Sequence, residues 1–83
     1  MIEIIRALSS PNALEVYRTI LHADPEPVTT AEIEREHQLS RSTASRILVS
    51  LSRSGALIRH HHGKHSYYVV NPSKMKLLQE LVP

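Results

Sequence analysis

The chain has 83 residues, of which 41% are apolar and 22% charged, a composition typical of one small globular domain. It contains no cysteine, which excludes disulfides, thiolate catalysis and cysteine zinc sites. No apolar run approaches the roughly 18 residues of a membrane helix and the first residues lack the pattern of a signal peptide, so we expect one cytoplasmic domain over residues 1–83.

The formal net charge of +2 conceals a strong asymmetry along the chain. Residues 1–36 hold seven of the eight acidic residues but only three of the ten basic ones. Residues 37–79 hold no acidic residue, seven basic residues and five of the six histidines. This basic part indicates a surface for a polyanion, with nucleic acid the default candidate, although a solvated basic surface has the same composition.

Two helices are predicted at the start of the chain. Apolar residues at positions 2, 4, 5 and 8 fit a short helix over residues 2–8. Ser10 and Pro11 then supply an N-cap and a first helical position. The second helix ends near His22, because the following Asp24-Pro25-Glu26-Pro27 contains two prolines that cannot continue it.

A short polar helix is predicted next, from Glu32 to about His37. The segment from Thr29 to Glu32 matches a capping box, in which Thr29 accepts a hydrogen bond from the new helix and Glu32 reaches back to Thr29. Gln38 and Leu39 form the turn that follows.

A longer helix follows this turn. Ser40 is a natural N-cap, so the helix begins at Arg41, and Gly55 is a natural terminator, so it ends at Ser54. One side carries a one-sided apolar stripe at helical spacing, made by Ala44, Ile47, Leu48 and Leu51.

Beyond Gly55 the hydrophobic period changes. Residues 56–59 and 67–70 are rich in strand formers, and His62-Gly63 lies between them, which predicts a β-hairpin with a basic, histidine-rich tip. Asn71-Pro72 begins a last helix over about residues 72–82. The predicted fold class is mainly α with a small β-hairpin (α+β): a winged helix-turn-helix with a two- or three-stranded wing.

The longer helix of the motif carries hydrogen-bonding residues on the side away from its apolar stripe. Because Ser and Thr are mediocre helix formers, their density there needs a cause, and entry of the helix into a DNA major groove supplies one. Arg46 is placed to contact bases, whereas Arg41 faces the DNA backbone or an outer base. A merely solvated face is the alternative. The predicted contacts of this helix are Arg41, Ser42, Thr43, Ser45, Arg46, Ser50 and Arg53.

The sequence resembles the ArsR-type winged-helix repressors over about two thirds of its length. Residues 8–21 (LSSPNALEVYRTIL) are similar to the Pro-led opening helix of that family, and residues 31–70 to its helix-turn-helix and wing, most specifically at LSRSTASRIL, SGALI and GKHSYY. The resemblance implies a symmetric dimer on an imperfect DNA palindrome. It also implies that residues 41–54 are the recognition helix and residues 59–65 the wing.

The sequence departs from the family pattern at three positions and in one motif. Glu34 and His37 stand where small or apolar residues are usual, and Gln38 stands where glycine is frequent. The cysteine metal-sensing motif is absent, and Glu80 is the single acidic residue of the last helix. Metal sensing of the family type is therefore not expected, and DNA binding is unaffected.

Histidines crowd the predicted wing, and three interpretations stay open. They contact phosphates or the minor groove, or they are solvent-exposed without a role, or His60, His62 and His65 form a weak metal site. The first is favoured and predicts wing contacts from Arg59, His61, His62 and Lys64. It also predicts that DNA affinity rises as the pH falls toward about 6, where histidine gains charge.

The terminal helices carry more apolar surface than a small monomer easily hides. They form a two-fold dimer interface or complete the core of the monomer, and we favour the dimer because palindromic half-sites require a two-fold axis. The predicted interface residues are Ile2, Ile5, Leu8, Leu77, Leu78 and Leu81.

The residues favour one function class over two others. The leading hypothesis is a sequence-specific regulator of transcription, in particular a dimeric repressor, that binds palindromic double-stranded DNA. A winged-helix module for protein–protein interaction is the alternative, although such modules usually lose the basic, hydroxyl-rich face. An enzyme is not expected, because the chain has no glycine-rich nucleophile turn or phosphate loop. We expect no cofactor, and the sequence identifies no small-molecule effector.

Overall fold

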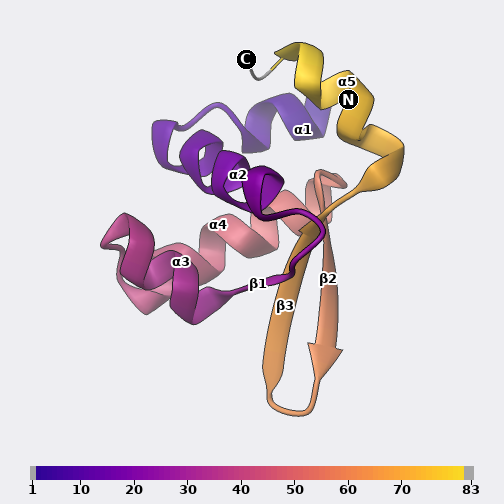
Figure 1. The fold of residues 1–83 in the computed structure, drawn as a ribbon. Helices are drawn as coiled ribbons and strands as arrows, with labels where there is room; N and C mark the ends of the chain where they lie inside the picture. The colour runs from indigo at the N-terminus through magenta and orange to yellow at the C-terminus, as the bar shows by residue number, and fades with distance from the viewer. Residues whose placement is uncertain (1, 82–83) are drawn as a thin grey trace.

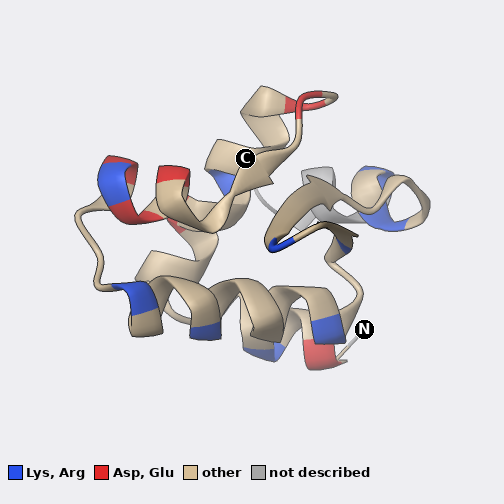
Figure 2. Cartoon of the chain, turned by 90° about the horizontal axis from the view of Figure 1, so that it is seen from below, with Lys and Arg blue, Asp and Glu red and all other residues tan. Residues whose placement is uncertain are grey.

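A computed structural model of the chain describes the backbone of residues 2–81 and the side chains of residues 2–76. Its elements are α1 (Ile2–Ala7), α2 (Pro11–Ala23), β1 (Val28–Thr29), α3 (Thr30–His37), α4 (Arg41–Ser54), β2 (Leu57–His62), β3 (His65–Val70) and α5 (Pro72–Leu81). Figure 1 shows the hairpin β2–β3 projecting away from the helices. Figure 2, turned by 90°, shows α4 along one edge of the molecule. This arrangement confirms the predicted winged helix-turn-helix.

The predicted N-caps Ser10, Thr29 and Ser40 are confirmed, although the helix expected from Glu32 already begins at Thr30. The side-chain oxygens of Ser10, Thr29 and Ser40 accept hydrogen bonds from the backbone N–H groups three residues later, at 3.1, 3.2 and 3.2 Å. The second half of the predicted capping box is wrong: no hydrogen bond of the described residues involves the Glu32 carboxylate. Thr29 instead belongs to β1 and pairs with Tyr67 of β3 in the sheet.

Two helices end in residues with a left-handed backbone. Gly55 ends α4 with φ of 93°, as predicted, and its N–H donates to the carbonyl oxygens at the end of that helix. Gln38 ends α3 with φ of 54°, a conformation that costs a residue with a side chain more than it costs glycine. The turn therefore keeps its left-handed geometry without the glycine that would suit it best.

The sheet has three antiparallel strands in the order β1-β3-β2. The third strand, β1, has only two residues, which pair with Tyr68 and Tyr67. The hairpin strands are longer than predicted, because pairing continues as far as His62 opposite His65. The wing histidines therefore lie on strands rather than in a loop, and Gly63, with φ of 64°, makes the tight turn possible.

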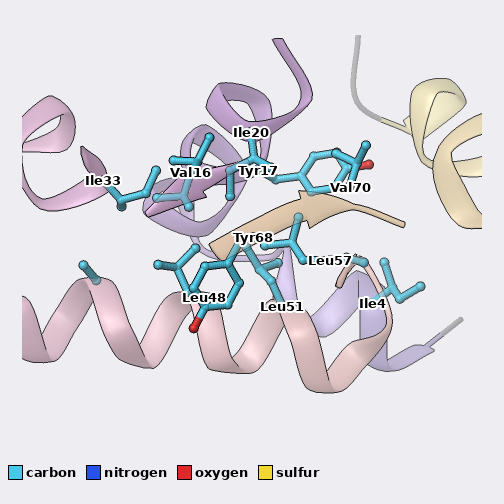
Figure 3. Packing of buried hydrophobic residues seen from close by; sticks show 13 residues of the cluster. Ile4, Val16, Tyr17, Ile20, Ile33, Leu48, Leu51, Leu57, Tyr68 and Val70 are labelled. Atoms are coloured by element: carbon cyan, nitrogen blue, oxygen red, sulfur yellow. The ribbon is translucent and has the colours of Figure 1, made fainter. Parts of the chain in front are cut away.

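The core lies between the sheet and helices α1 to α4. Figure 3 shows Leu48 and Leu51 of α4 pointing into it from one side and Tyr17 and Ile20 of α2 from the other. Ile4 of α1 is 1% exposed and closes one end of the cluster. The Tyr17 ring is fully buried, and its hydroxyl has no hydrogen-bond partner in the described structure. Desolvation raises the pKa of this hydroxyl above its ordinary value.

A single asparagine joins the end of α4 to the start of α5. Asn71 Nδ2 donates to the carbonyl oxygen of Gly55 at 2.8 Å, and its backbone N–H donates to the carbonyl oxygen of Ala56 at 3.1 Å. Its Oδ1 accepts hydrogen bonds from the N–H and the hydroxyl of Ser73 at 3.1 and 2.8 Å, which caps α5. Asn71 therefore serves both helix ends at once.

The predicted dimer residues divide into three groups. Ile2 and Ile5 of α1 are 66% and 51% exposed, whereas Leu8 packs against the core of its own chain. Leu77, Leu78 and Leu81 lie outside the described side chains.

In the part of the chain that is described, no helix is both long and apolar enough to span a membrane.

Candidate nucleic-acid interface

Helix α4 presents a polar side to solvent while its apolar stripe holds it to the core. Ala44, Leu48 and Leu51 are fully buried. The opposite side exposes Arg41, Ser42, Arg46, Ser50 and Arg53. Figure 2 shows basic residues spaced along the outer edge of this helix. The amphipathic pattern therefore fixes which side of α4 faces a partner.

An open groove lies between α4 and the wing; we call it the wing groove. Its volume is about 940 Å³. It is lined by Thr29, Thr30, Ala31, Glu34, Arg41, Ser42, Ser45, Arg59, Lys64, His65, Ser66, Tyr67 and Tyr68. Five predicted DNA contacts meet here although they come from separate elements: Arg41, Ser42, Ser45, Arg59 and Lys64.

A second groove lies on the side of α4 that faces α1; we call it the α1 groove. Its volume is about 460 Å³. It is lined by Glu3, Arg6, Ala7, Arg46, Val49, Ser50, Arg53 and Ser54. Arg46, Ser50 and Arg53 are the predicted DNA contacts among these. The two arginines near the start of α4 therefore differ in place, with Arg41 toward the wing and Arg46 toward α1.

Three predicted contact residues line neither groove. The Thr43 hydroxyl accepts a hydrogen bond from Ser40 Oγ at 2.9 Å and so belongs to the cap of α4. His61 and His62 are exposed on the hairpin. The sheet register places His61 on the same face as Arg59, and His62 on the opposite face.

The sheet register gathers three of the wing histidines on one face of the hairpin. The register places His62 directly opposite His65, and His60 on the same face as both, as the weak-site alternative required. Even so, no three histidine, aspartate or glutamate side chains in the described part of the chain are grouped to hold a metal ion.

The basic side chains of both grooves are available for an anionic partner. Among the described side chains, the single ion pair joins Arg18 Nη1 to Glu15 Oε1, 3.4 Å apart, and neither residue lines a groove. Each groove contains three Lys or Arg side chains and one carboxylate, which is Glu34 in the wing groove and Glu3 in the α1 groove. Helix α4 therefore lies between two surfaces with an excess of positive charge.

Sequence reasoning missed several lining residues. Ser66 of the wing groove accepts hydrogen bonds from Arg59, and only the strand register reveals that the two lie together. Glu3 and Arg6 of the α1 groove lie in the acidic part of the sequence, at least forty residues from Arg46 and Arg53. No local pattern signals such pairings.

Comparison with known families gives one match, over residues 10–73, to the model described as the sugar-specific transcriptional regulator TrmB. This match covers more than half of the chain. No curated protein sequence matches the chain.

Solved structures of winged helix-turn-helix regulators are similar in fold. HlyU from Vibrio cholerae has a TM-score of 0.80 and 20% identity, over 96% of this chain and 84% of HlyU. A homodimeric winged helix-turn-helix DNA-binding domain from Mycobacterium bovis, described as a possible ArsR-family regulator, has a TM-score of 0.80 and 20% identity, over 96% and 71% of the two chains. These similarities confirm the fold that the ArsR resemblance implied.

Proposed function

This chain belongs to the TrmB family of transcriptional regulators, and we propose that it binds double-stranded DNA by inserting α4 into the major groove. One observation carries the proposal: α4 exposes a polar, basic side and lies between two open grooves that each hold three basic residues and one acidic residue. A helix in the major groove meets base edges in front and phosphates on both sides, and this distribution of side chains matches that requirement.

Base recognition falls to the exposed residues in the middle of α4. Arg46 carries the planar fork of donors that bonds O6 and N7 of guanine, and Ser42 and Ser50 are short enough to let the helix approach closely. The half-buried Val49 beside Arg46 is available to the methyl group of thymine. We assign these residues to sequence specificity and Arg41 to the backbone.

The wing contributes phosphate or minor-groove contacts. Arg59 and Lys64 lie in the wing groove opposite Arg41, so a phosphate in this groove meets basic side chains from two directions. His61 and His62 extend this contact along the exposed end of the hairpin. The whole of residues 1–83 acts as one DNA-binding domain in this proposal, in the cytoplasm and without a cofactor.

The active form is a homodimer that represses transcription from a palindromic site. Exposure of Ile2 and Ile5 supports an interface through α1, since solvent-exposed isoleucines on adjacent turns are stabilised by burial against a second copy. We place Leu8 in the monomer core and keep Leu77, Leu78 and Leu81 as proposed interface residues. Two-fold symmetry then presents the two copies of α4 to half-sites about one helical turn apart.

Selection of bound sequences from random duplex DNA, repeated at low and high salt, tests this function. We expect an enriched palindrome and an affinity that falls steeply with salt, because phosphate contacts release counterions. An enriched motif without symmetry contradicts the dimer. Absence of DNA binding at every salt concentration contradicts the function itself and favours the protein-interaction module.

A further inference from the structure

The α1 groove is built by a contact that the helix-turn-helix and wing do not require. Helix α1 packs against α4, and Ile4 anchors it in the core. Figure 3 shows Ile4 at the end of the buried cluster, next to the end of α4. With Ile4 inward, Glu3, Arg6 and Ala7 lie on the side of α1 that faces the recognition helix.

The chemistry of this groove suits a phosphate chain. Arg6 joins Arg46 and Arg53, so that three arginines line the groove together with the apolar side chains of Ala7 and Val49. All three arginines are exposed, and none takes part in an ion pair or side-chain hydrogen bond of the described residues. Guanidinium groups in this state bind phosphate oxygens in bidentate geometry without first giving up a partner.

The position of the groove identifies the strand that occupies it. A helix in the major groove is flanked by the backbones of both DNA strands. The wing groove takes its α4 residues from positions 41–45 at the start of the helix, and the α1 groove takes them from positions 46–54, where α1 lies. We propose that the α1 groove binds the sugar–phosphate backbone of the strand away from the wing, with Arg6 as a phosphate contact. This inference rests on the proposed DNA binding.

Helix α1 therefore has two roles on two sides. Ile2 and Ile5 face outward and are available to a second copy, while Arg6 faces the DNA. The Glu3 carboxylate lines the same groove and opposes a phosphate there. Glu3 thus weakens the contact that Arg6 makes. Removal of the Glu3 charge is expected to raise the affinity for DNA, and removal of the Arg6 charge is expected to lower it.

The experiment measures the affinity of the full-length chain for a mixed-sequence DNA duplex as a function of salt. We expect Arg6→Gln to lower the affinity about three- to ten-fold at low salt and to reduce the salt slope by about one. We expect Arg6→Lys to keep the slope, and Glu3→Gln to raise the affinity about two-fold. Lys74→Gln on α5 removes the same charge outside both grooves and is expected to change neither quantity.

The outcomes separate this inference from the function on which it rests. If Arg41→Gln weakens binding while Arg6→Gln behaves like Lys74→Gln, the α1 groove holds no phosphate and this inference is overturned. The same conclusion follows if Glu3→Gln and Arg6→Gln both weaken binding, because loss of α1 packing then explains the effect. If the unaltered chain binds no duplex at any salt concentration, the proposed function fails and takes this inference with it.

Discussion

Arg59 on β2 is held across the hairpin by Ser66 on β3, whose Oγ accepts hydrogen bonds from Nε and Nη2 of the guanidinium at 3.2 and 3.1 Å. The register sets Ser66 opposite His61, so this contact is diagonal and lies on the face that His61 and Arg59 share. The bond orders a long side chain that would otherwise lose rotamer freedom on meeting DNA.

Removal of this contact is expected to weaken DNA binding without affecting the fold. We expect Ser66→Ala to lower affinity about two- to five-fold, since Arg59 must then be ordered on binding, and to leave the selected sequence unchanged. Fluorescence anisotropy on one duplex measures this change. In the Arg59→Gln background Ser66→Ala is expected to have no further effect, and an equal loss in both backgrounds contradicts the link.

The exposed isoleucines of α1 are expected to hold the dimer together. Ile5→Glu places a charge on a side chain that is 51% exposed, so the fold tolerates it while a buried interface does not. We expect sedimentation to show a monomer and affinity for the palindrome to fall more than about ten-fold, because only one half-site is bound. Asn12→Glu, on the exposed start of α2, is the control. A dimer that survives Ile5→Glu places the interface elsewhere.

The left-handed turn between α3 and α4 offers a stabilising substitution. Gln38 has φ of 54°, so Gln38→Gly is expected to raise the free energy of unfolding by about 0.5–1 kcal/mol. Gly55→Ala is expected to lower it by about 1 kcal/mol, for reasons of backbone strain only, since no atom lies within 4 Å of the added Cβ. Denaturant unfolding measures both, and effects of the same sign would contradict the account.

The unpartnered hydroxyl of Tyr17 is expected to cost stability. Because its buried oxygen accepts and donates no hydrogen bond in the described structure, Tyr17→Phe is expected to raise the free energy of unfolding by about 1 kcal/mol. Tyr68→Phe is the matched control. The ring of Tyr68 is also buried, but its hydroxyl is not a buried group that lacks a hydrogen-bond partner. Urea unfolding at neutral pH distinguishes the two, and a loss of stability in Tyr17→Phe contradicts this account.

Burial of the Tyr17 hydroxyl also leads us to expect a loss of stability at alkaline pH. Burial raises the pKa of Tyr17 above 10.0, so the unfolded chain releases this proton at lower pH than the folded chain. The contribution of this group to the free energy of unfolding is therefore fully present below pH 10 and is lost as the pH rises above that value. We expect Tyr17→Phe to remove this part of the decline, and unfolding curves at pH 9 and about pH 11 test it.

Local patterns predicted the elements, and long-range pairing decided the rest. The caps at Ser10, Thr29 and Ser40 and the terminator Gly55 were predictable because each acts within a few residues of its own helix. Strand β1 was not, because two residues become a strand only through Tyr67 and Tyr68, nearly forty positions later. The same limit applies to the candidate site. Helical spacing predicted the exposed residues within α4, but it could not predict which residues of other elements lie beside them in the two grooves.

The α1 groove shows why the interface could be predicted only in part. Arg6 lies in the acidic part of the sequence, and a charge count along the chain assigns it away from the basic surface. Burial of Ile4 then turns α1 onto α4 and brings Arg6 to Arg46 and Arg53. The distribution of charge along the sequence therefore differs from its distribution on the surface, because α1 from the acidic part of the sequence packs on α4 from the basic part.

The two sets of hydrogen bonds made by Asn71 bear on the spacing between DNA half-sites rather than on the affinity for either one. In the proposed dimer, α5 supplies part of the interface while α4 reads the DNA, and Asn71 joins the two by hydrogen bonds to the end of α4 and the start of α5. The separation of the two copies of α4, and with it the number of base pairs between half-sites, is then expected to depend on this joint. Operator spacing is then expected to be set in part at a residue that touches no base.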